Sequence, residues 1–114
     1  MATIRELCDL KIKLFRDIDQ LSPEVIAQEL VELSSLWASV QKEWIDRRMW
    51  YAEKKKQMLL EHGKAALATI HAEASPEYRQ YLEAEAYSKS ILEMIRTGKR
   101  YIRLAEESKR ESMY

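Results

Sequence analysis

Glycine and proline are nearly absent from this chain of 114 residues, which holds two of each. Sheets and active sites built on loops need many such turn-forming residues, whereas long helices need almost none. The shortage therefore predicts an all-α fold. Two glycines also cannot build a glycine-rich phosphate-binding loop, so that class of nucleotide site is not expected.

Disulfides and an excess of charge are missing too. The single cysteine, Cys8, excludes an internal disulfide and fits a reducing compartment. Lysine plus arginine equals aspartate plus glutamate at 19 each, so no overall field attracts the chain to nucleic acid or lipid. No apolar run reaches the roughly 18 residues of a membrane span, and Met1 is followed by a charged amphipathic segment. These features predict a cytoplasmic protein without membrane contact.

Groups of residues that could carry catalysis are absent as well. His62 and His71 stand nine residues apart without cysteines or paired carboxylates, which is no metal-site spacing. The glutamates lack the Glu-x-x-His pairs of a di-metal helical bundle. Cys8 falls on the apolar flank of a predicted helix and is expected in the core, not as a nucleophile. We therefore expect no catalytic residue, cofactor or metal, and a protein that is not an enzyme.

Two matching tripeptides organise what is present, Ser22-Pro23-Glu24 and Ser75-Pro76-Glu77. Each has the chemistry of a helix start: serine accepts hydrogen bonds from exposed amides, proline has no amide to leave unpaired, and glutamate favours the positive end of the helix dipole. Between them Gly63 is the first helix breaker, so a turn at 63–64 with partial helix after it is expected. The predicted helices span 3–19, 23–61 and 76–110.

Apolar periodicity indicates how these helices pack. In the first, Leu7 and Leu14 lie on the predicted stripe, and Cys8 and Phe15 widen it. The second has a coiled-coil-like seam, which makes its tryptophans core residues: Leu30, Leu33, Trp37, Val40 and Trp44. Small residues of the third, such as Gly98, are expected to face the tryptophans. We predict a single domain over 1–114, a long antiparallel helical hairpin with the short N-terminal helix packed on one end.

Aromatic residues gather at the opposite end of the hairpin, where no third helix is expected. Tryptophan, tyrosine and methionine are enriched in interface cores, and an uncovered apolar patch needs a partner. The alternative is that these rings only thicken a two-helix core. A second copy is always available as a partner, which favours a homodimer. The candidate partner-binding residues are Met49, Trp50, Tyr51, Tyr78, Tyr81 and Tyr87.

Two basic clusters allow a second hypothesis. In an antiparallel hairpin each cluster lies beside an acidic segment of the other helix, so one interpretation is charge pairing that selects the orientation. The other is a stripe that binds phosphate, as in a nucleic-acid-binding accessory of replication or recombination. The candidate nucleic-acid contacts are Arg47, Arg48, Lys54, Lys55, Lys56, Arg96, Lys99, Arg100 and Arg103.

From about Leu30 onward the chain resembles small coiled-coil proteins encoded in bacteriophage early regions, often in replication or recombination neighbourhoods. The resemblance rests on aromatic and alanine positions of the second helix, the glycine-containing connector before Glu73, the run Tyr81-Leu82-Glu83-Ala84-Glu85-Ala86, and Ile91-Leu92 with Arg96. The family pattern has a larger apolar residue near Gly98, where this chain departs from it. The resemblance implies a phage-encoded adaptor or inhibitor of a host or phage protein, acting in the host cytoplasm, and supplies no functional residues.

Overall fold

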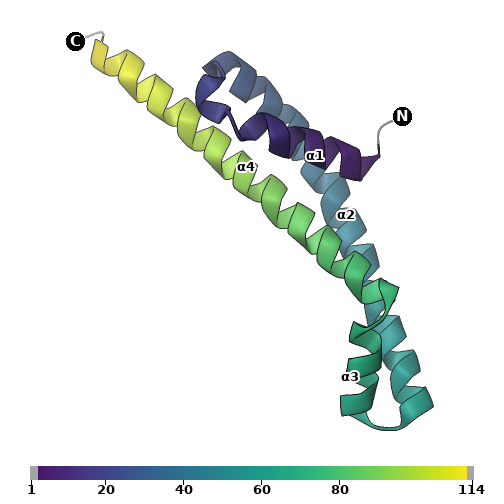
Figure 1. The fold of residues 1–114 in the computed structure, drawn as a ribbon. Coiled ribbons are helices and arrows are strands. Elements are labelled where there is room, and N and C mark those ends of the chain that lie inside the picture. Colours follow the sequence, from purple (N-terminus) through teal and green to yellow (C-terminus); the bar gives the residue numbers. More distant parts are fainter. Residues whose placement is uncertain (1–2, 113–114) are drawn as a thin grey trace. The chain divides into compact units, whose positions relative to one another are not determined.

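The computed structural model describes residues 3–112, and nearly all of them are helical (Figure 1). The elements are α1 (Ile4–Phe15), a 3₁₀ helix (Ile18–Gln20), α2 (Pro23–His62), α3 (Ala65–Glu73) and α4 (Pro76–Ser112). No strand occurs within the described residues. The predicted all-α class is confirmed, with its two long helices and its short N-terminal helix. Among residues 3–112, no helix is long and apolar enough to cross a membrane.

The helices begin where the sequence predicts. Thr3 caps α1 in a capping box: its hydroxyl accepts from the amide of Glu6, and the Glu6 carboxylate accepts from the amide of Thr3. The hydroxyls of Ser22 and Ser75 each accept from the amide three residues on, at 3.3 and 3.4 Å. α1 ends at Phe15 and the 3₁₀ helix follows, so the first predicted helix is shorter than 3–19.

The connector between the long helices follows its prediction. Gly63 ends α2 with a φ of 70°, a left-handed conformation that a residue without Cβ adopts at little cost. α3 begins two residues later and buries Ala68 and Ala72. The expected partial helix is therefore a complete short helix of 9 residues.

The chain forms two compact units, to which both long helices contribute. Of the described residues, unit 1 comprises 3–39 and 89–112, and unit 2 comprises 40–88. In unit 1, α1 and the start of α2 pack with the end of α4. Its most deeply buried side chains come from all three helices: Cys8, Ile26, Leu33 and Ile91.

The buried face of α1 differs from the predicted stripe. Cys8 and Phe15 are buried, whereas Leu7 is 38% exposed, so the two residues expected only to widen the stripe form its centre. Lys11 lies on α1 beside two glutamates of α2, Glu29 at 2.5 Å and Glu32, and forms ion pairs with both. The double pairing joins α1 to α2 in unit 1, and Cys8, three residues before Lys11, is fully buried.

Gly98 lies where α4 packs closely against α2 in unit 1. A Cβ at this position would lie 2.7 Å from Cδ2 of Leu30 and 3.4 Å from Cγ2 of Ile26. The predicted contact of large against small residues is therefore present here, but the large partners are Leu30 and Ile26 instead of the tryptophans.

In unit 2 the later part of α2 runs antiparallel to α3 and to the start of α4. Contacts of Gln41, Arg47 and Tyr51 reach steadily earlier residues of α4, namely Ser88, Gln80 and Tyr78. At the end of α2, His62 stacks on His71 of α3 with ring centroids 4.1 Å apart. α3 thus lies beside the end of α2 (Figure 1). In unit 2, α2 therefore pairs with α3 near its end and with α4 before that.

Candidate functional site

Three of the predicted partner-binding residues form one cluster in unit 2. The ring centroid of Tyr51, on α2, lies 4.9 Å from that of Tyr78 and 5.7 Å from that of Tyr81, both on α4. All three side chains are half-buried. The rings fill the space between α2 and α4, so this arrangement favours a structural role for the cluster.

The electrostatics of the cluster agree with that role. Burial raises the pKa of Tyr51 above its ordinary value, and the negative charge of Glu73 raises it further. Hydrogen bonding to Glu85 raises the pKa of Tyr81 most, and burial adds to it. Both raised pKa values disfavour the charged phenolate of Tyr51 and of Tyr81, so these two rings contact each other as neutral groups with polar edges.

Trp50 lies next to Tyr51 in sequence but on another flank of α2, because successive residues of a helix are turned by about 100°. The indole is 49% exposed. Arg47 covers part of it, with the guanidinium carbon 4.5 Å from the ring centroid. Arg47 in turn donates to Gln80 of α4 at 2.8 Å and lies 3.6 Å from the carboxylate of Glu43. Trp50 is therefore a half-exposed ring held in place by an anchored cation.

Met49 belongs to a further face of α2. It is 58% exposed, and Ile45, one turn earlier, is 51% exposed. Leu59 and Leu60 add exposed apolar surface near the end of the helix. Sequence reasoning missed Ile45 and the two leucines because they do not follow the main seam. Tyr87, the sixth candidate, is half-buried on α4.

A pocket of about 330 Å³ lies beside Trp50. Its lining comes from both long helices: Trp50, Glu53, Lys54, Gln57 and Glu77. Oε2 of Glu77 is shielded from solvent and accepts no hydrogen bond from residues 3–112. Buried polar atoms are nearly always paired, so this oxygen is an exception among the described residues, but protein atoms cover it.

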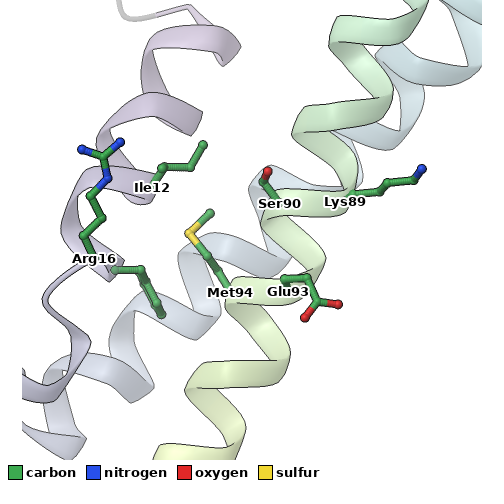
Figure 2. A pocket seen from close by; sticks show the side chains of 7 residues that line it. Ile12, Arg16, Lys89, Ser90, Glu93 and Met94 are labelled. Atoms are coloured by element: carbon green, nitrogen blue, oxygen red, sulfur yellow. The ribbon is translucent and has the colours of Figure 1, made fainter.

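Two apolar grooves of about 400 Å³ lie elsewhere. In unit 1, Ile12 of α1 and Met94 of α4 point toward each other across the first, while Lys89 points away from it (Figure 2). In unit 2, the second groove runs between α2 and α3, with Lys55 and Lys56 among its lining residues.

The predicted nucleic-acid contacts are spread over both units. Three of the arginines are paired with a carboxylate one turn away in their own helix: Arg47 with Glu43, Arg96 with Glu93, and Arg103 with Glu107. Lys54 lines the pocket beside Trp50, and the positive charge of Arg48 acts on Tyr81. Lys99 and Arg100 are exposed on α4 in unit 1. The neighbouring carboxylates lower the net positive charge that these three arginines present along their helices.

The cysteine and the two histidines lie in different places. Cys8 is fully buried, and the stacked pair His62 and His71 is exposed. In the part of the chain that the structure describes, no three histidine, cysteine, aspartate or glutamate side chains are grouped to hold a metal. Comparison of the chain with protein-family models, with curated proteins and with solved structures found no match in any of the three. The interpretation of the site depends on its own residues.

Proposed function

We propose that this chain is a non-enzymatic protein that acts by binding another protein through the exposed side of α2 in unit 2. The observation that carries the proposal is the exposure of Ile45, Met49 and Trp50, each about half open to solvent. Burying one such side chain contributes on the order of 1.5–3 kcal/mol. Exposed apolar surface rimmed by charges is typical of interaction sites.

Trp50 is the proposed centre of this surface. Tryptophan is among the residues that contribute most to protein interfaces. Because Arg47 is tied to Gln80 and Glu43 while it covers the indole, little conformational entropy of Trp50 remains to be lost on binding. A ring that is already held in place binds more tightly than a mobile one.

Capture of partners from an expressing or infected cell tests the proposal. The chain with Met49→Ala plus Trp50→Ala is compared with the wild type and with Leu104→Ala, which removes an equally exposed leucine of unit 1. We expect the double variant to lose proteins that the wild type and the control retain, while circular dichroism shows an unchanged helix content. Equal capture by all three folded proteins would contradict the proposal.

Sedimentation of the same proteins shows whether a second copy is the partner. A wild-type dimer that the double variant dissociates supports self-pairing through this surface, which is the common two-fold solution. A wild-type monomer supports a different protein as the partner. The resemblance to phage early proteins supports an adaptor or inhibitor of this kind in the host cytoplasm.

Nucleic-acid binding remains the alternative, and a gel shift separates it. Contacts to phosphate release counterions, so their affinity falls steeply with salt. The ion pairs of Arg96 and Arg103 within α4 disfavour it. A salt-sensitive shift of DNA or RNA that Arg100→Glu abolishes would replace protein binding as the proposed function.

A further inference from the structure

The groove between α2 and α3 in unit 2 combines an apolar lining with positive charge. It has a volume of about 400 Å³ and is lined by Ala52 and Leu59 of α2 and by Ala65 and Ala68 of α3. Leu59 is 44% exposed. Thr69 also lines the groove, and its hydroxyl already donates to the carbonyl of Ala65 at 3.0 Å. Apart from its two lysines, the groove therefore offers an occupant mainly apolar surface.

The charge of the groove has one sign. Lys55 and Lys56 are its charged lining residues, and both are exposed. Within residues 3–112, neither lysine forms an ion pair. The nearest carboxylates of α2 are engaged elsewhere, since Glu53 lines the pocket beside Trp50 and Glu61 accepts a hydrogen bond from Gln57. The positive charge of the groove is thus left without a partner in the described chain.

Helix geometry places the two lysines on either side of an apolar row. Ala52 and Leu59 are seven residues apart, about two turns, so they lie on the same side of α2. Lys55 and Lys56 fall between them, and successive residues of a helix are turned by about 100°, so one lysine lies on each side of the row. Ile45 is seven residues before Ala52 and 51% exposed. The row therefore continues from the groove into the surface proposed for protein binding.

We propose that this groove receives an apolar side chain of the partner protein that has acidic residues next to it in sequence. The apolar side chain is buried against Ala52 and Leu59, and the carboxylates pair with Lys55 and Lys56. The N-terminus of α3, which begins at Ala65, adds the positive end of a helix dipole. A protein segment that lies along the row from Ile45 fills the groove without leaving α2. This inference rests on the proposed protein-binding function and names the chemistry of the partner segment.

A titration with short peptides tests the groove without knowledge of the partner. The probe is an acetylated and amidated Gly-Glu-Leu-Glu-Gly peptide, added to the full chain while the backbone amide resonances of Ala65, Ala68 and Thr69 are followed by NMR. One matched peptide carries glutamine in place of both glutamates, which removes the charge. Another carries alanine in place of leucine, which removes the large apolar side chain and keeps the charge.

We expect a saturable shift of these three resonances with the probe and a lower affinity for either matched peptide. Lys55→Gln plus Lys56→Gln should lower the affinity for the probe about fivefold, as loss of two exposed ion pairs does, and added salt should shrink that difference. Lys13→Gln plus Lys42→Gln removes two exposed lysines outside the groove and should leave the affinity unchanged. Equal affinity for the probe and either matched peptide, or equal affinity of the groove variant and the wild type, would overturn the inference.

Other occupants of the groove are tested in the same titration. Octanoate represents a fatty acid, a thymidine dinucleotide represents nucleic acid, and dilution of the chain without ligand tests for a second copy. The inference predicts that the probe binds more tightly than octanoate and the dinucleotide, and that dilution leaves the three resonances in place. Tighter binding of either small ligand, or a shift on dilution, would show that the groove serves a different occupant.

Capture experiments separate this inference from the function on which it rests. If Met49→Ala plus Trp50→Ala loses the partner while Lys55→Gln plus Lys56→Gln retains it at full affinity, the interaction surface stands and the assignment of the groove is wrong. If both variants lose the partner, and neutralising acidic residues beside an apolar residue of that partner reproduces the loss, both are supported. If only the lysine variant loses the partner, the groove stands and the proposed centre at Trp50 is wrong. If no variant loses a partner, both are wrong.

Discussion

A methyl group added at Gly98 probes a close contact of α2 and α4 in unit 1. Its carbon would lie 2.7 Å from Cδ2 and 3.3 Å from Cγ of Leu30, and 3.4 Å from Cγ2 of Ile26. Overpacking of this kind costs about 1–3 kcal/mol. Alanine in place of glycine inside a helix stabilises the helix by about 1 kcal/mol. We therefore expect Gly98→Ala to change the free energy of unfolding by between zero and about 2 kcal/mol, in the destabilising direction.

The effect of Gly98→Ala on the free energy of unfolding should change sign when Leu30 is shortened. In a Leu30→Ala background the clashing atoms are gone, so Gly98→Ala should stabilise the chain by about 1 kcal/mol through helix propensity alone. The coupling between the two positions is then about 1–3 kcal/mol, measured by urea unfolding followed by circular dichroism. Leu104→Ala serves as the control background, in which Gly98→Ala should behave as in the wild type. Additive effects of Gly98→Ala and Leu30→Ala would refute the contact.

Three further perturbations follow from the structure. The raised pKa of Lys11, which Glu29 and Glu32 cause against the opposing effect of burial, means that the folded chain holds this proton more tightly than the unfolded chain. The contribution of this group to the free energy of unfolding should therefore be fully present below about pH 10.4 and be lost as the pH rises further. The free energy of unfolding should fall less in Lys11→Met than in the wild type. Urea unfolding at two alkaline pH values checks this, and an equal fall in both proteins would contradict it. Gly63→Ala should cost about 1–2 kcal/mol because of its positive φ, whereas an unchanged melting temperature would show that the turn relaxes. Ser75→Ala should cost about 0.5–2 kcal/mol by removing the cap of α4, and thermal unfolding that matches the wild type would show that this cap is dispensable.

The helix boundaries could be predicted because their signals are local. The hydroxyls of Ser22 and Ser75 accept from amides of their own first helical turn, which does not depend on the rest of the fold. Gly63 ends a helix because its own backbone adopts a positive φ at little cost. The buried face of α1 could not be predicted in the same way. Leu7, Cys8 and Phe15 are all apolar, and which of them is buried depends on how α1 lies against α2 and α4 in unit 1.

The candidate site was predictable only in part. Met49, Trp50 and Tyr51 are consecutive, and helix geometry places them on three different flanks of α2, about 100° apart. Met49 and Trp50 lie on neighbouring exposed flanks, whereas Tyr51 is turned toward α4, so sequence proximity grouped one packed ring with two open side chains. The pocket beside Trp50 depends on the register of α2 against α4, which brings Glu77 to the indole. No periodicity within either helix contains that information.

Oxidative footprinting tests the central claim most directly. The chain is exposed to hydroxyl radicals alone and in complex with its captured partner, and oxidation is read residue by residue by mass spectrometry. We predict that Met49 and Trp50, both open in the isolated chain, become protected in the complex, while the equally exposed Leu104 of unit 1 does not. Unchanged oxidation of Met49 and Trp50 in a complex that is demonstrably intact would contradict the account.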